Sequence, residues 1–250
     1  MSTLEYGWTS AGSVHSIRMV HVAGTHGSPY SFGDGRDKRP IEVPDFFIAT
    51  VPVTQALWIH VMGVGSNESI RQGERRPVEN VSWDRITQPD GFLDRINASP
   101  IPGLITERLP AHTSATFRLP SESEWEYAAR GGEYWRAGFR YSGSNDVDAV
   151  AWYEGNSGKV THEVGQREPN QLVIHDMCGN VWEWCQDCFS RDIRNIPCNG
   201  SALVGSSPQR VLRGGCHHSW AVHCTVSKRY EIARRYGDAC IGFRVALSIA

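Results

Sequence analysis

The pattern of apolar and polar positions predicts short strands near both ends of the chain. Residues Ile17 to Val22 and Ile41 to Ala49 are rich in β-branched and aromatic side chains, and a polar, glycine-rich loop is expected between them at residues 24–39. Gly242 to Leu247 has the same strand-like character near the C-terminus. Residues 89–116 are irregular and rich in proline, so we expect a surface loop there.

Two short helices are predicted from their terminal residues. Thr54 precedes an apolar run that ends at Gly63, and these residues suit the N-cap and C-cap of a helix. Ser82 is a second N-cap candidate, and a helix is expected to begin at Trp83.

The clearest local signal is a third helix after Pro120. Ser121 and Glu124 have the spacing of a capping box, and Gly131 ends the apolar pattern. Trp125, Ala128 and Ala129 fall on one face and are predicted to pack inward. We attribute the acidic residues at positions 122–126 to capping of the helix N-terminus.

Composition then narrows the class of protein. With 25 glycines, 13 prolines and 9 tryptophans in 250 residues, we expect a loop-rich domain with short strands, and residues 1–250 form one domain. A net charge of −2 gives no indication of a nucleic-acid or membrane-surface partner. Seven cysteines, an odd number, favour reduced thiols over a disulfide framework.

The chain shows no secretory signal and no apolar run of roughly 18 residues that would predict a membrane span. The default expectation is therefore a cytoplasmic protein, with display through a partner left open.

Six segments, read in order, resemble the formylglycine-generating-enzyme (sulfatase-modifying factor) family. They are Pro52–Gln55, Pro77–Trp83, Arg118–Gly132, Gly179–Trp184, Arg213–Gly215 and Gly242–Arg244. The resemblance implies an α+β protein with the C-type-lectin-like fold, rich in loops, with short strands and a few short helices. Its members include copper-dependent oxidases, domains attached to non-haem iron enzymes, and the variable proteins of diversity-generating retroelements.

The oxidases bind copper(I) through two cysteines at set distances after Arg-Gly-Gly, and this resemblance implies positions 219 and 224 here. Position 224 is Cys224, but position 219 is Ser219, a hard and poorly ionised ligand for copper(I). Cys216 is the remaining thiol that could join Cys224 in a copper-dependent formylglycine-generating oxidase acting on sulfatase cysteines. We keep that activity as the alternative.

The preferred interpretation is a non-enzymatic protein that binds its ligand through a diversified C-terminal surface. Residues 213–244 form the candidate variable segment, in which aromatic and histidine residues replace the polar run of binding-type relatives. Such side chains suit protein recognition. The predicted contacts for a protein or other macromolecular ligand, within residues 216–240, are His217, His218, Ser219, Trp220, Val222, His223, Tyr230, Glu231, Ile232, Tyr236 and Asp238. Surface positions are favoured for Trp220 and the histidines.

The sequence contains two further candidate metal sites. Asp176, Gly179, Val181 and Glu183 match a calcium site of the family, with two carboxylates and two backbone carbonyls as oxygen ligands. The alternative is that the two carboxylates only brace a turn. Cys185 and Cys188 form a CxxC pair, a weak indication of zinc.

Overall fold

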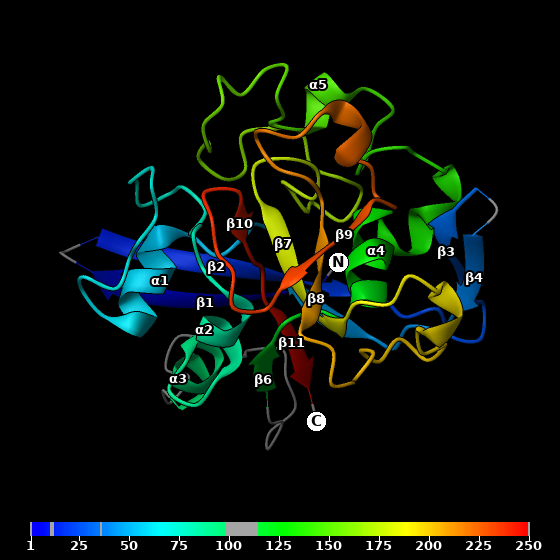
Figure 1. Ribbon diagram of the computed structural model, residues 1–250, viewed down its shortest axis with the longest axis horizontal. Coiled ribbons are helices and arrows are strands. Elements are labelled where there is room, and N and C mark those ends of the chain that lie inside the picture. The colour runs from blue at the N-terminus through cyan, green and yellow to red at the C-terminus, as the bar shows by residue number, and fades with distance from the viewer. Residues whose placement is uncertain (1, 11–12, 36, 99–114, 250) are drawn as a thin grey trace.

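The computed structural model describes residues 2–10, 13–35, 37–98 and 115–249, and it combines three small sheets with short helices (Figure 1). The strands are β1 Thr3–Ser10, β2 Ser13–Val22, β3 Tyr30–Asp34, β4 Asp37–Ile41, β5 Phe46–Ala49, β6 Ala115–Arg118, β7 Trp182–Cys188, β8 Gln209–Arg213, β9 Arg229–Ala233, β10 Ile241–Gly242 and β11 Ala246–Ile249. The helices are α1 Gln55–Met62, α2 Trp83–Thr87, α3 Phe92–Ala98, α4 Glu122–Ala129 and α5 Val147–Val150, with 3-10 turns η1 Gly132–Ala137, η2 Ile193–Asn195 and η3 Ala221–His223.

A five-stranded sheet brings the two ends of the chain together. Its order is β1-β2-β5-β11-β6, and each neighbouring pair runs antiparallel. The C-terminal strand β11 lies between β5 and β6, so the last strand of the chain closes against early ones. The strand predicted at Ile17 to Val22 is confirmed as part of β2.

A four-stranded sheet of order β10-β7-β8-β9 stands at the centre of the face seen in Figure 1. The register pairs Leu212 with Tyr230 and Arg210 with Ile232, and β10 joins β7 in parallel. The strand predicted at Gly242 to Leu247 is divided between this sheet and the first: β10 ends at Gly242 and β11 begins at Ala246.

The predicted helix caps are confirmed. The Thr54 and Ser82 hydroxyls accept hydrogen bonds from the amides of Leu57 and Arg85, respectively. Helix α4 carries the complete capping box: Ser121 accepts from the amide of Glu124, and the Glu124 carboxylate accepts from the amide of Ser121.

Two predictions of irregular structure are wrong in part. The expected loop at residues 24–39 contains the β3–β4 hairpin, because Tyr30 and Phe32 alternate with smaller residues and are buried against α4. Within the expected loop at 89–116, residues 92–98 form α3, with Phe92 and Ile96 buried. Residues 99–114 lie outside the described part.

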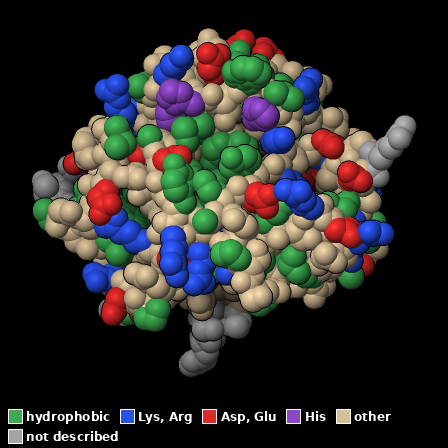
Figure 2. Space-filling view, viewed as in Figure 1, with side chains coloured by type: hydrophobic (Ala, Val, Ile, Leu, Met, Phe, Trp, Pro, Cys, Tyr) green, Lys and Arg blue, Asp and Glu red, His purple; other side chains and the backbone are tan. Residues whose placement is uncertain are grey.

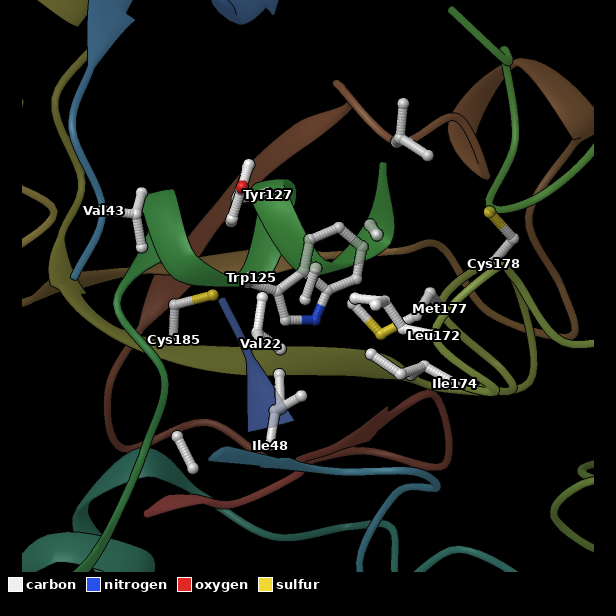
Figure 3. Close-up of a cluster of buried hydrophobic side chains, with 14 of the residues drawn as sticks. Val22, Val43, Ile48, Trp125, Tyr127, Leu172, Ile174, Met177, Cys178 and Cys185 are labelled. Atoms are coloured by element: carbon white, nitrogen blue, oxygen red, sulfur yellow. The ribbon is translucent and has the colours of Figure 1, made fainter. Parts of the chain in front are cut away.

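The core has two buried clusters, and the larger surrounds α4. The Trp125 ring extends from α4 among Val22, Leu172 and Met177 (Figure 3), and Ala128 and Ala129 are buried beside it, so the predicted inward face is confirmed. Across the described residues, no helix has both the length and the apolar character needed to span a membrane.

Candidate functional site

A pocket of about 600 Å³ opens above the four-stranded sheet. Hydrophobic side chains gather at the centre of this face, with histidines above them (Figure 2). The lining residues are Trp182, Leu212, Cys216, His218, Ser219, Trp220, His223, Lys228, Tyr230, Ile232, Tyr236, Asp238, Cys240 and Ile241. We call this the sheet pocket.

The sheet forms the floor of the pocket through strand alternation. Tyr230 and Ile232 are two residues apart on β9, so they share one face, and Leu212 lies directly across from Tyr230 on β8. The Tyr230 ring stacks on Trp182 of β7, with centroids 5.5 Å apart and an interplanar angle of 30°. The floor is therefore a rigid aromatic and aliphatic surface.

Three aromatic side chains of the pocket are exposed to solvent. Trp220 is 68% exposed, Tyr230 49% and Tyr236 47%. Large aromatic side chains have few rotamers. They therefore lose little conformational entropy when they bury apolar area against a partner. His218, His223 and Asp238 add polar groups at the edge of the same pocket.

The structure brings together eight of the predicted contact residues: His218, Ser219, Trp220, His223, Tyr230, Ile232, Tyr236 and Asp238. Val222 is exposed but lines a different hollow. Glu231 alternates to the opposite face of β9, where it pairs with Arg191. The surface position expected for His217 is wrong, because this side chain is buried and its Nδ1 lies 3.0 Å from the carbonyl oxygen of Asn180.

The turn that enters the pocket needs glycine. Gly215 has a φ of +78°, and a Cβ there would lie 2.7 Å from the Cys224 sulfur. Beyond it, Ser219 braces the turn: its hydroxyl accepts from the amide of Cys216, and its amide donates to the Cys216 carbonyl. The position of Cys216 and of the pocket wall follows from this turn.

A buried ion network holds the sheet against α4. The Arg213 guanidinium pairs with Glu126 and lies 3.7 Å from Glu122, which also pairs with Arg229 of β9. Glu126 pairs with Arg130 as well. The attribution of residues 122–126 to capping is therefore correct for Glu124 and wrong for Glu122 and Glu126, each of which pairs with an arginine of a distant strand.

Arg213 also fixes the segment that leads into β9. Its guanidinium donates to the carbonyl oxygens of Val226, Ser227 and Lys228, each at 2.9 Å. Since these carbonyls come just before Tyr230, the network sets where the pocket floor begins.

Comparison with known proteins assigns the chain to a family. Residues 16–249 match the sulfatase-modifying factor enzyme 1-like domain. The chain belongs to the sulfatase-modifying factor family. It is 36% identical to the chaperone protein LppX of Paenibacillus barcinonensis over 223 residues, covering 73% of this chain and 75% of that protein.

Two further proteins similar to this chain carry names that indicate different functions. The formylglycine-generating enzyme of Streptomyces coelicolor is 28% identical over 230 residues, which cover 82% of this chain and 65% of that enzyme. Among solved structures, Treponema denticola variable protein 1 superposes with a TM-score of 0.77 at 28% identity, over 97% of this chain and 98% of that one. The expected α+β fold of the C-type-lectin-like, sulfatase-modifying factor type is thereby confirmed.

The positions that hold copper in the oxidases of the sulfatase-modifying factor family do not fit copper(I) here. The Ser219 hydroxyl is engaged by the Cys216 amide, and Cys224 lies fully buried in the α4 cluster. Burial raises the pKa of the Cys224 thiol, an effect that the nearby Cys178 and Cys216 reinforce. A buried, protonated thiol and a serine hydroxyl make a poor ligand pair for copper(I).

The family's calcium ligands have other partners in this chain. Both Glu183 oxygens accept from Arg244, at 2.7 Å each, and Oε2 also accepts from the Trp125 indole at 2.7 Å. Asp176 accepts from the amide of Gly165. Because a guanidinium already neutralises Glu183, the set formed with Gly179 and Val181 fits calcium poorly, and the two carboxylates act as braces of the turn.

The remaining thiols differ in environment. The Cys185 and Cys188 side chains of β7 are both buried, and the three-ligand cluster found among the described residues contains neither of them. That cluster consists of Cys216, His217 and Cys240. Hydrogen bonds from the Cys240 thiol, and then from Ser219 and the His218 amide, lower the pKa of the Cys216 thiol.

Several residues that line the pocket are not predicted from the sequence. Trp182 alternates with the buried Glu183 in the Gly-Asn-Val-Trp-Glu-Trp motif, so strand periodicity could have placed it on the opposite face. Cys240 carried no local signal, because its proximity to Cys216 depends on the chain returning after β9.

Proposed function

We propose that this chain is a non-catalytic binding protein that recognises a protein or other macromolecular ligand through the sheet pocket. The single observation that carries the proposal is the set of exposed aromatic rings, Trp220, Tyr230 and Tyr236, gathered around one pocket of about 600 Å³. Tryptophan and tyrosine dominate the energetics of protein interfaces, and here Tyr230 belongs to the sheet floor and stacks on Trp182.

The residues that hold the sheet in place are buried, whereas the aromatic rings of the pocket are exposed. This separation favours a binding surface whose residues can be exchanged without loss of the fold. Arg213, Glu122 and Glu126 are buried and charged, and they fix the strand that carries Tyr230. The exposed rings themselves take no part in these ion pairs. This arrangement, and the similarity to Treponema denticola variable protein 1, support a function like that of the variable proteins of diversity-generating retroelements.

The oxidase alternative is disfavoured on chemical grounds. Ser219 occupies one of the two copper positions, and the thiol at the other, Cys224, is fully buried. No thiolate pair is thus available at those positions to activate oxygen on a bound copper(I) ion.

The proposal is tested by panning a phage-displayed library of small folded domains against the immobilised protein. The recovered binders are then measured against Trp220→Ala and Tyr230→Ala. We expect each substitution to weaken binding at least tenfold, about 1.4 kcal/mol, for most binders.

Tyr134→Ala is the matched control, because Tyr134 is 48% exposed and does not line the sheet pocket. Its removal should leave the binders unaffected. Binders that are insensitive to both pocket substitutions, or equally sensitive to the control, would contradict the proposal.

A further inference from the structure

Three potential metal ligands meet beside the sheet pocket, and two of them, Cys216 and Cys240, line it. One ligand atom each from Cys216, His217 and Cys240 lies within 4.8 Å of the other two. Cys216 follows the Arg-Gly-Gly turn, whereas Cys240 immediately precedes β10, so the fold brings them together. This cluster differs from the positions 219 and 224 that hold copper in the family's oxidases.

The donor set suits zinc. Two thiolates and one imidazole are the protein ligands of several zinc sites in which the fourth position stays open. With zinc–sulfur bonds of about 2.3 Å, two sulfurs of a tetrahedral site lie roughly 3.8 Å apart. Small side-chain rotations close the observed spacing to that distance, since all three ligand atoms already lie within 4.8 Å of one another.

The His217 ring is anchored through Nδ1, so Nε2 is the nitrogen left for a metal. Its Nδ1 lies 3.0 Å from the backbone carbonyl of Asn180, which only accepts, so Nδ1 carries the proton and Nε2 keeps its lone pair. The backbone amide of His217 donates to the same carbonyl at 2.9 Å. A histidine anchored to a carbonyl through one ring nitrogen is the usual outer-shell arrangement of metal sites.

Two hydrogen-bond donors point at the Cys216 sulfur. The amide of His218 and the hydroxyl of Ser219 both direct a proton toward its sulfur, each at 3.4 Å. The amide of Cys240 donates to the Asp238 carboxylate at 2.8 Å, which fixes the backbone that carries the second thiol. Both cysteines also line the sheet pocket.

We propose that Cys216, His217 and Cys240 form a zinc site whose fourth coordination position opens to the sheet pocket. Water fills that position, or a donor atom of a bound ligand does. The site stands on its own ligand geometry and does not depend on the proposed binding function.

The test is a zinc titration of the full chain, reduced and freed of metal with a chelator, in competition with a chromophoric chelator. We expect one tight equivalent, weakened at least tenfold in Cys240→Ser and in Cys216→Ser. Cobalt(II) in place of zinc should give the sulfur-to-cobalt charge-transfer absorption of thiolate ligation, lost in the same variants. Cys198→Ser is the matched control, because Cys198 is exposed and lies outside the cluster.

Circular dichroism shows whether each variant folds, and Cys240→Ser, at a half-buried position, carries the test if Cys216→Ser does not fold. The assignment would be overturned if zinc did not bind, or if zinc binding survived in folded Cys240→Ser. Binding of copper(I) without binding of zinc would also overturn it. A Cys216–Cys240 disulfide that resists reduction would do the same. None of these outcomes alters the panning result, so the two proposals fail separately.

Discussion

Arg244 and Glu183 form a two-point ion pair that is wholly buried, although the residues are 61 positions apart. The Arg244 guanidinium also donates to the carbonyls of Ala49 and His175, and Glu183 accepts from the Trp125 indole. Three of the motifs that identify the family therefore meet at one point beneath the sheet pocket. Their shared role is to join the two sheets and α4.

The first prediction concerns this ion pair. Glu183→Gln leaves the Arg244 charge buried without its counter-ion, and breaking a buried pair in this way costs about 3–5 kcal/mol. Urea unfolding monitored by tryptophan fluorescence should show this loss in the free energy of unfolding.

The matched control for Glu183→Gln is Arg75→Ala, because the Arg75–Glu163 pair is largely exposed. That substitution should change the unfolding midpoint very little. Equal effects of the two substitutions would contradict the assigned role of the buried pair.

A second prediction concerns Arg213, which donates to three consecutive carbonyls before β9. Lysine keeps the charge but cannot reach Glu126 and these carbonyls together, since its donors lie at one point. In Arg213→Lys, the amides of residues 226–230 should exchange hydrogen at least tenfold faster. Arg235→Lys, at an exposed arginine, should leave exchange unchanged, and equal protection in both variants would count against the role of Arg213.

A third prediction is a pH dependence that arises from Asp187. Burial, and then the charge of Glu122, raise the pKa of this carboxyl from 3.8 to about 7. Because the folded state holds the proton more tightly, the stabilisation is fully present below about pH 4 and is lost as the pH rises through about 7. The urea midpoint should therefore be lower at pH 8 than at pH 5.

Asp187→Asn tests the source of that pH dependence. Asparagine cannot titrate, so the difference between the midpoints at pH 5 and pH 8 should narrow, even if the variant is less stable at both. An undiminished difference would assign the pH dependence to other groups.

A fourth prediction distinguishes a binding protein from a copper-dependent oxidase. With copper(I), oxygen and a cysteine-containing sulfatase peptide, we expect no formylglycine product, because Ser219 and the buried Cys224 leave no thiolate pair at the two positions that hold copper in the family's oxidases. Mass spectrometry of the peptide measures the product. Turnover that disappears in Cys224→Ala would identify an oxidase and contradict the proposed function.

The sequence predicted those features that depend on neighbouring residues. Thr54, Ser82 and Ser121 cap helices because each hydroxyl meets an amide three residues along the chain. The family resemblance added the fold, since its motifs lie in the right order over almost the whole chain.

The sequence did not predict features that depend on contacts between distant segments. Glu122 and Glu126 resemble ordinary N-terminal acidic residues of a helix, but each also pairs with an arginine of a strand that the helix signal does not contain. His217 and His218 are adjacent and chemically identical, yet one is buried and the other exposed, because the turn after Gly215 points them in different directions. No periodicity in the sequence marks such a turn.

The central claim is that the exposed residues of the sheet pocket recognise the ligand while the buried network maintains the fold. A displayed library in which His218, Trp220, Tyr230 and Tyr236 are randomised together tests it most directly, with resistance to protease as the measure of folding. We predict that most clones stay as resistant as the original chain and that panning yields clones with new specificities. Clones that mostly lose protease resistance, as a library at the buried Val211 and Leu212 should, would show that these residues serve the fold and would contradict the claim.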